Sequence, residues 1–360
     1  MAGGLFELRR DDITGWWVAT VVDREFDRAR FARPARRVPT PDTGCQNCRS
    51  TPDGRAWLRT LKPQAFTLGA NVPPGAAMPR DRGREGSGPG EGVPEELALG
   101  LLGDVGSWET IVAPDGHHGA LSEETEAIVI QMLALARECI VRAQGQRGTE
   151  YLQVVQNWGE QAGAMTNHLC FDVYDLPHIP HRIGEELGGA ARYVIKEGVC
   201  PWCRLVETEV ARRDRLVFDD AASVCFAPYA SRSPFELWVV PRHHEADFGK
   251  ATDEQLTSAA ETLRKVIGML GSLEGPAYNL VLHTAPLHEN VRETYHWHWE
   301  IHPRLREIGG LELGTGLPVN PISPEEAVDE LLASTRVASG ESAARDEPDV
   351  GRSWNDFPRR

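Results

Sequence analysis

The same order of motifs occurs twice along this 360-residue chain. In each half, a Cys-x-x-Cys pair precedes an apolar strand that ends at a proline, followed by adjacent histidines, a helix and a second strand that carries a histidine. The number of residues from His117 to His168 nearly equals the number from His244 to His296. Near-equal spacing with matching local order predicts an internal duplication. We therefore expect two similar folding units, since the chain is longer than one hydrophobic core usually supports.

The sharpest local pattern lies at 295–305, where polar and apolar side chains alternate and predict a β-strand. Successive strand side chains point to opposite faces, so four polar residues share one face (His296, His298, Glu300, His302) and four apolar residues the other (Tyr295, Trp297, Trp299, Ile301). Imidazole titrates near neutral pH and is the commonest protein metal ligand. The polar face is expected to carry metal ligands, phosphate contacts or proton-transfer groups, although a half-buried strand without chemistry would show the same alternation.

Each half supplies two thiols and two imidazoles, the usual composition of a closed tetrahedral zinc site. A single Cys-x-x-Cys pair would equally suit a redox site, but two copies in register with histidines favour zinc, with two ions per chain. The expected ligands are Cys45, Cys48, His117 and His168 in the first half and Cys200, Cys203, His244 and His296 in the second. The neighbouring histidines, His118 and His243, stay open as alternates.

Composition narrows the possible partners and the compartment. The formal net charge of −15 argues against a general nucleic-acid binder, which presents a basic stripe. No apolar run reaches the roughly 18 residues that span a bilayer, and the first ten residues lack the apolar core of a signal peptide. We therefore expect a cytoplasmic protein with no membrane contact, in which seven cysteines favour metal binding over disulfides.

Two helices are predicted at equivalent places in the two halves. The first is expected to begin after an N-cap at Ser122 and to bury one face (Ile128, Met132, Leu135, Cys139). The second follows a capping box formed by Thr252 and Gln255. Strands are expected near 16–22, 110–113, 151–157, 236–240 and 278–282.

Two stretches carry no apolar period. Residues 71–94 are rich in glycine and proline among scattered charges, which is typical of a mobile loop. Residues 337–360 follow a helix with a capping box at Ser323 and mix charges with Ser, Gly and Pro, which predicts a disordered tail.

Longer motifs carry a family resemblance. They are Leu8-Arg9-x-Asp11-x-x-Thr14-Gly15-x-Trp17-Val18, Pro228-Tyr229-Ala230-Ser231-Arg232-x-Pro234-Phe235-Glu236, Tyr278-Asn279-Leu280-Val281-Leu282-His283-Thr284-Ala285-Pro286, Tyr295-His296-Trp297-His298-x-Glu300-Ile301-x-Pro303-Arg304-Leu305 and Glu312-Leu313-Gly314-Thr315-Gly316, together with both cysteine pairs. With them the chain resembles, from residue 8 to about 332, the galactose-1-phosphate uridylyltransferase family. This is a branch of the histidine-triad superfamily that includes the ADP-sugar phosphorylases.

The resemblance implies an α+β fold of duplicated histidine-triad-like domains, each an antiparallel sheet with helices packed on it. The domains would span 1–190 and 191–336, with 337–360 as the tail. It further implies a homodimeric enzyme that transfers a nucleoside monophosphate from a nucleotide sugar to a sugar phosphate. The implied substrate-binding residues are Asn157, Ser231, Arg232, Asn279 and Glu300, and the implied catalytic residues are Cys170, Asp172 and His298.

The chain departs from the family at the nucleophile. Where the family carries His-Pro-His-x-Gln, this sequence has His168-Leu169-Cys170-Phe171-Asp172, which keeps the zinc histidine but puts Cys170 in the place of the nucleophile. A cysteine needs a lowered pKa to attack phosphorus, and the carboxylate of Asp172 would tend to raise it. A substitute histidine at His178 or His181 would require a break in the alignment.

Three functions remain open on the sequence. The first is nucleotidyl transfer or phosphorolysis of a nucleotide sugar, with Cys170 as nucleophile or by direct in-line transfer. The second is hydrolysis of a nucleotide, with Asp172 as the base that activates water. The third is a zinc-containing nucleotide-sugar-binding protein that has lost transfer activity.

Overall fold

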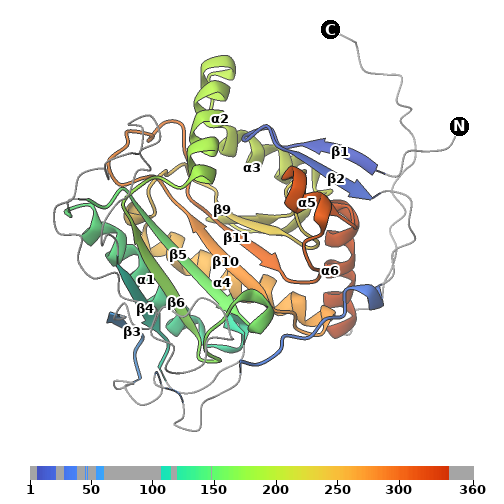
Figure 1. The fold of residues 1–360 in the computed structure, drawn as a ribbon, viewed down its shortest axis with the longest axis horizontal. Helices are drawn as coiled ribbons and strands as arrows, with labels where there is room; N and C mark the ends of the chain where they lie inside the picture. The colour runs from blue at the N-terminus through green and yellow to red at the C-terminus, as the bar shows by residue number, and fades with distance from the viewer. Residues whose placement is uncertain are drawn as a thin grey trace, which may run out of the picture.

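The computed structural model describes residues 6–21, 28–38, 45, 47, 54–60, 107–114, 120–146 and 148–339. A nine-stranded antiparallel sheet with the order β3-β4-β6-β5-β10-β11-β9-β8-β7 runs through the molecule (Figure 1). Its strands are β3 (Trp57–Thr60), β4 (Trp108–Val112), β5 (Tyr151–Trp158), β6 (Cys170–Leu176), β7 (Leu216–Asp219), β8 (Ser223–Phe226), β9 (Leu237–Pro241), β10 (Tyr278–His283) and β11 (His298–Pro303). The α+β class expected from the resemblance is confirmed.

The sheet has a two-fold internal order. The first half contributes β3-β4-β6-β5 and the second contributes β10-β11-β9-β8, and the halves meet where β5 pairs with β10. Val155 on β5 is opposite Asp172, and Val281 on β10 is opposite Glu300. Asp172 and Glu300 therefore occupy equivalent positions on one face of the sheet, as a duplicated unit requires.

Helices α1 (Glu126–Ala143) and α4 (Asp253–Met269) cover the other face of the sheet and form one core with both halves. Side chains from the two helices, β6 and β11 meet there without contact with solvent, among them Met132, Leu263, Phe171 and Trp299. Each fully buried apolar side chain of this size contributes about 1.5–3 kcal/mol. The expected boundary between domains at residues 190 and 191 lies inside α2 (His181–Glu197), so a division into two domains stays a prediction.

Of the two predicted helix starts, that of α4 is confirmed and that of α1 is wrong. The capping box of α4 forms as expected between Thr252 and Gln255. Ser122 does not cap α1: it lies in the 3-10 turn Leu121–Glu123, and Thr125 accepts the N–H of Ile128 instead. The cause is Leu121, which is buried and donates its N–H to Tyr278, so the chain is anchored one turn before the helix begins. The buried side chains of α1 are accordingly Val129, Met132, Leu133, Ala136, Cys139, Ile140 and Ala143, whereas Ile128 and Leu135 are half-buried.

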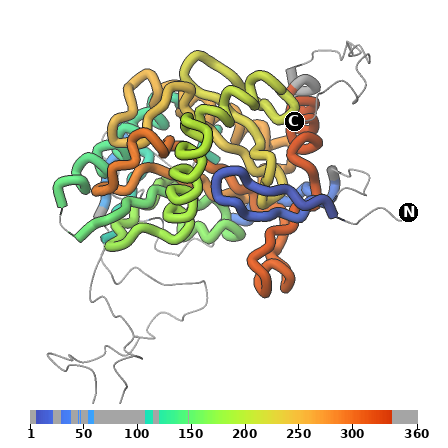
Figure 2. The backbone as a smooth tube through the Cα atoms, turned by 90° about the horizontal axis from the view of Figure 1, so that it is seen from above, coloured from blue at the N-terminus to red at the C-terminus, as the bar shows by residue number. Residues whose placement is uncertain are grey.

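A three-stranded sheet joins the start of the chain to its C-terminal part. It contains β1 (Phe6–Arg10), β2 (Trp17–Val21) and β12 (Val319–Asn320), and β12 lies between α5 (Gly310–Thr315) and α6 (Pro324–Ser339). We call β1, β2 and the turn between them the N-terminal ribbon, and Figure 2 shows it beside α6. The turn of the ribbon packs on α2 so closely that a Cβ at Gly189 would lie 1.7 Å from the carbonyl oxygen of Ile13.

Helices α2 and α3 (Pro201–Arg212) lie at the end of the molecule that the ribbon occupies (Figure 1). Neither helix was predicted from the sequence, although Pro201 at the first helical position is a usual starting signal. In the part of the chain that the structure describes, no helix combines the length and apolar character needed to cross a membrane.

Two further predictions need correction. The strand expected from residue 295 begins only at His298, because the N–H of Trp297 bonds to the carbonyl of Glu245 rather than to a neighbouring strand. Tyr295 consequently packs on Trp202 and does not share the apolar face of the strand. Helix α6 continues to Ser339, so the disorder expected from residue 337 is wrong for 337–339. Residues 340–360 and the loop 71–94 lie outside the described residues.

Candidate functional site

The second cysteine pair and two histidines come together at the start of α3. One ligand atom each of Cys200, Cys203, His244 and His296 lies within 4.8 Å of the others. Cys203 Sγ is 3.2 Å from Nδ1 of His244 and 3.8 Å from Nδ1 of His296. The alternate His243 is exposed and outside the group. Two thiols and two imidazoles at this separation fit a tetrahedral zinc ion.

Backbone carbonyls fix both histidines of this group in the ligand tautomer. Nε2 of His296 donates to the carbonyl of Pro241 at 3.0 Å, and Nε2 of His244 donates to that of Arg292 at 2.7 Å. Each Nδ1 is then left with its lone pair toward the thiols. A hydrogen bond with Cys203 lowers the pKa of Cys200, which favours the thiolate that a metal requires.

The first half repeats part of this arrangement. Nε2 of His168 donates to the carbonyl of Ala113 at 2.8 Å, and its Nδ1 lies 3.9 Å from Sγ of Cys45. Ala113 follows β4 as Pro241 ends β9, so the equivalent histidine of each half uses the equivalent carbonyl. Cys48, His117 and His118 lie outside the described residues, and the four-ligand set of the first half stays a prediction.

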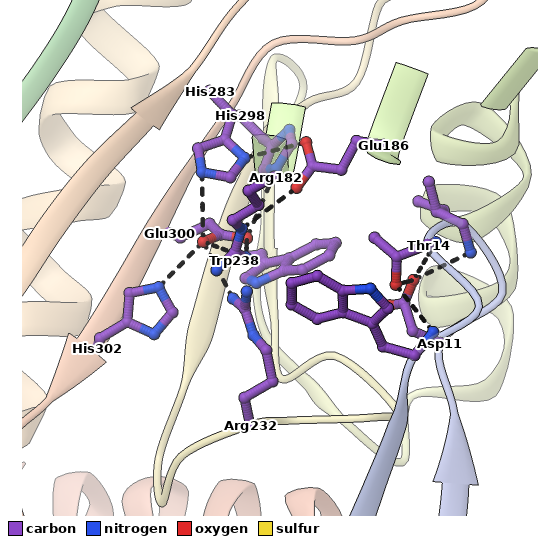
Figure 3. Close-up of polar contacts among 12 residues, drawn as sticks. Asp11, Thr14, Arg182, Glu186, Arg232, Trp238, His283, His298, Glu300 and His302 are labelled. Carbon is purple, nitrogen blue, oxygen red and sulfur yellow. Dashed lines mark hydrogen bonds and ion pairs between the residues drawn. The ribbon is translucent and has the colours of Figure 1, made fainter. Parts of the chain in front are cut away.

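Three of the other predicted site residues, Arg232, His298 and Glu300, belong to a buried charge network in the second half (Figure 3). At its centre Glu300 is fully buried and accepts from Arg182 at 2.8 Å, from Arg232 at 3.0 Å and from His302 at 3.0 Å. Burial by itself would raise the pKa of Glu300, but the positive charge of Arg232 and further contacts hold it well below its usual value. Glu300 is thus an ionised carboxylate surrounded by donors.

The predicted phosphate ligands Ser231 and Arg232 both bond to other groups of the protein. Ser231 is buried and donates to the carbonyl of Pro228 at 2.7 Å. Arg232 is held by Glu236 at 2.5 Å as well as by Glu300, and these carboxylates raise its pKa despite burial. The hydroxyl proton of Ser231 is therefore used within the protein, and the charge of Arg232 is neutralised by Glu236 and Glu300.

His298 sits on the same side of the sheet, between the rings of Trp202 and Trp238. It is fully buried, its Nδ1 donates to the carbonyl of His296 at 3.0 Å, and its Nε2 is 3.9 Å from Glu300. Its neighbour His283 donates from Nδ1 to Glu186 at 3.1 Å, and Tyr295 donates to the same carboxylate at 2.7 Å. A small cavity next to the N-terminal ribbon is lined by Trp202, Trp238 and Arg182.

The equivalent face of the first half is more open. Cys170, which occupies the place of His298 in the duplicated order, is half-buried, as are Gln153, Val155, Asn157 and Tyr174 on the same face. No described helix lies over these strands in Figure 1. The second half is closed by α2, α3 and the ribbon, so among the described residues this face of the sheet is less covered over the first half.

The environment of Cys170 disfavours a thiolate. Burial raises its pKa well above the ordinary thiol value, and Asp172 and Cys45 raise it further. Asp172 itself accepts from Trp108 Nε1 at 3.0 Å and from Thr110 at 3.1 Å, and burial raises its pKa. These groups lack the positive charge that would stabilise an attacking sulfur.

The two predicted asparagines form a linked pair at the junction of the halves. Asn279 donates from Nδ2 to Oδ1 of Asn157 at 2.6 Å and to the carbonyl of Ala162 at 2.8 Å. Oδ1 of Asn279 accepts from Nε of Arg304 at 2.5 Å. The sequence analysis quoted Arg304 in a motif but gave it no role.

Several other site residues were missed. Arg182 and Glu186 lie one helical turn apart on α2. Because this helix was not predicted, it could not be predicted that the two side chains share one face. His283 ends the predicted strand at 278–282, and its partners come from α2 and β11. The sequence shows charged residues on α2 and histidines on the strands, but only the tertiary contacts bring them together.

Comparison with known proteins gives relatives along most of the chain, although no protein-family model matches it. ADP-glucose phosphorylase of Arabidopsis thaliana is 26% identical over 334 residues, which cover 89% of this chain and 90% of that protein. Galactose-1-phosphate uridylyltransferase of Thermotoga maritima is 27% identical over 192 residues, 51% of this chain and 59% of that protein. The chain thus spans little more than half the length of that uridylyltransferase.

Solved structures agree in fold. A crystal structure of an ADP-glucose phosphorylase from Arabidopsis thaliana with bound ADP-glucose superposes with a TM-score of 0.66 at 24% identity, covering 91% of this chain and 98% of that one. The similarity to galactose-1-phosphate uridylyltransferases and ADP-glucose phosphorylase that the motifs indicated is confirmed.

Proposed function

We propose that this chain, a relative of ADP-glucose phosphorylase and of the galactose-1-phosphate uridylyltransferases, transfers a nucleoside monophosphate from a nucleotide sugar to a phosphate-bearing acceptor. The observation that carries the proposal is the alignment with ADP-glucose phosphorylase, which covers 89% of this chain and 90% of that protein. The open face of the first half, with Asn157, Asn279, Cys170 and Asp172, is the proposed place of reaction.

Two acceptors are supported by different relatives. A sugar 1-phosphate would make the reaction that of a galactose-1-phosphate uridylyltransferase, whose sequences match the chain over about half their length. Inorganic phosphate would make it a phosphorolysis, and the relative that matches along nearly its whole length is named ADP-glucose phosphorylase. In both reactions the α-phosphorus is attacked and a sugar phosphate is released.

Direct in-line transfer to the acceptor fits the site better than a covalent intermediate on sulfur. The thiol of Cys170 is held in its neutral form by burial and by Asp172, and a neutral thiol is a weak nucleophile. Hydrogen-bond donors such as the amide of Asn157 would then stabilise charge on the phosphoryl oxygens during transfer.

We further propose two structural zinc ions, one in each half. Support comes from the four converging ligands of the second half and from the matching His168 and Cys45 of the first. Zinc held by two thiolates and two imidazoles would brace the start of α3 against β11. Free thiols in this geometry suit a reducing, cytoplasmic compartment. Exposed Phe6, Leu8 and Trp17 on the N-terminal ribbon support a homodimer.

The test is a panel of nucleotide sugars incubated with the zinc-loaded protein, with inorganic phosphate, with galactose 1-phosphate or with neither. Release of a sugar phosphate that depends on an acceptor supports nucleotidyl transfer, and the acceptor required tells the two reactions apart. Equal turnover without acceptor would assign hydrolysis. Tight binding of a nucleotide sugar with no turnover under any condition would leave the binding protein as the function.

A further inference from the structure

Arg304 is positioned by its own backbone and by one amide. Its N–H donates to the carbonyl of Ala277 at 2.7 Å, which continues the pairing of β10 and β11 by one residue. Its Nε donates to Oδ1 of Asn279 at 2.5 Å, and Asn279 is buried and held in turn by Asn157 and the carbonyl of Ala162. The guanidinium is thus anchored through Nε, while its two Nη groups make no hydrogen bond within the described residues.

Three other arginines near this part of the sheet are neutralised by carboxylates. Arg182 pairs with Glu300, Arg215 with Glu209 and Glu325, and Arg232 with Glu236 and Glu300. Within the described part of the chain, Arg304 has no carboxylate oxygen within 4 Å, because the nearby Glu307 is bound to Arg33 at 2.5 Å. The pKa values follow this difference: carboxylates raise those of Arg215 and Arg232, whereas burial lowers that of Arg304.

Arg304 is exposed at the surface, so its guanidinium is accessible, and it has no carboxylate partner among the described residues. The unused Nη groups form a planar pair of donors, the geometry that recognises phosphate in a bidentate manner. Asn157 adds to them, since its Oδ1 accepts from Asn279 and its own amide N–H groups make no hydrogen bond within the described residues. Arg304 and Asn157, linked through Asn279, therefore present fixed donors with one positive charge.

The position of these donors relates them to the open face. Asn157, Asn279 and His302 lie opposite one another on β5, β10 and β11, so all three point to the face that carries Asp172 and Glu300. Neighbouring strands are about 4.8 Å apart, and Cys170 on β6 is on the next strand beyond Asn157. A phosphoryl group bound at Arg304 would therefore lie beside the proposed place of reaction.

We propose that Arg304 and Asn157, aligned by Asn279, bind a phosphoryl group of the substrate, and that Arg304 supplies the positive charge that Arg232 cannot. The identity of the ligand as a nucleotide sugar or sugar phosphate rests on the proposed function. The presence of an anion site at Arg304 rests on the contacts alone. Arg304 acts by binding and positioning, and Asn279 acts through Arg304 and Asn157.

The experiment compares dissociation constants for AMP and UMP with those for adenosine and uridine, by calorimetry, in wild type, Arg304→Ala, Arg304→Lys and Arg306→Ala. Arg306 is the control because it lies two residues away and is paired with Glu312. Arg304→Ala is expected to weaken binding of the nucleotide that wild type prefers by about tenfold or more, with no change for its nucleoside. Arg304→Lys is expected to restore part of the loss, and Arg306→Ala to change neither.

Thermal unfolding of each variant separates binding from folding. Equal weakening for nucleotide and nucleoside, or unchanged nucleotide binding in a folded Arg304→Ala, would overturn the assignment. Turnover of a nucleotide sugar that is insensitive to Arg304→Ala would reject the anion site and leave the proposed function standing. Nucleotide binding that depends on Arg304 without any turnover of a nucleotide sugar would support the anion site and reject the proposed function.

Discussion

Asp172 and Glu300 occupy equivalent positions in the two halves of the sheet, yet the pKa values of their carboxyl groups are shifted in opposite directions. Asp172 faces the neutral donors of Trp108 and Thr110, and burial raises its pKa. Glu300 faces Arg182, Arg232 and His302, which keep its pKa low despite burial. The second half thus contains a buried ionised network. The equivalent face of the first half is more open and carries a carboxyl group whose pKa is raised.

The zinc proposal predicts two zinc ions per chain in protein purified without chelator, measured by elemental analysis. Cys200→Ser and His296→Ala should each remove one ion and destabilise the second half, because structural zinc contributes directly to folding free energy. Cys139→Ala is the matched control, since Cys139 is a buried cysteine in the core of α1. A metal content near zero in wild type would contradict the proposal.

Cys170→Ala is predicted to retain turnover within a few-fold of wild type, since a neutral buried thiol makes no contribution as a nucleophile. The measurement is acceptor-dependent release of sugar phosphate, together with the intact mass of wild type after incubation with the nucleotide sugar alone. Loss of turnover by a factor of a thousand, with a nucleotidyl adduct on wild type, would establish the covalent route instead.

Glu300→Gln is predicted to destabilise the fold by about 3–5 kcal/mol, because Arg182 and Arg232 would then lack their shared countercharge inside the protein. Urea unfolding monitored by tryptophan fluorescence measures the loss. The control is Glu307→Gln, whose carboxylate pairs with Arg33 at the surface and should leave the unfolding midpoint unchanged. Equal midpoints for both variants would argue against a critical network.

The two equivalent carboxyls should give opposite pH dependences of stability. The folded pKa of Asp172 is raised above the unfolded value of about 3.9, so ionisation costs stability as pH rises through the folded pKa. Asp172→Asn removes that cost, and its stability relative to wild type should increase between about pH 4 and pH 7. For Glu300, whose folded pKa is lowered, the stabilisation is present above the unfolded value of about 4.3 and is lost below it. Parallel profiles for Asp172→Asn and Glu300→Gln would contradict this.

Local sequence signals predicted the parts of the fold that local forces decide. The alternation from His298 to His302 and the capping box at Thr252 both depend on neighbours within a few residues. The start of α1 was misplaced because a distant tyrosine, Tyr278, fixes the preceding turn.

The roles of the charged residues could not be predicted in the same way. Arg232 matches a motif expected to bind phosphate, but Glu236 and Glu300 neutralise it, and Glu300 is 68 residues away in sequence. Arg304 lacks such a partner within the described residues, and this difference is visible only in the tertiary structure. A sequence shows which side chains carry charge, whereas their availability depends on tertiary pairing.

The pairing of β2 with β12 sets an order of events during synthesis. Arg9 bonds to Glu325, 316 residues further along, and β2 needs Val319 and Asn320 as its third strand. At about 5–20 residues per second, β1 and β2 wait for roughly 15–60 seconds before their partners are synthesised. The chain's beginning is therefore the last part to be secured, and a protein truncated after Gly316 should leave β1 and β2 open to proteases while the large sheet stays protected.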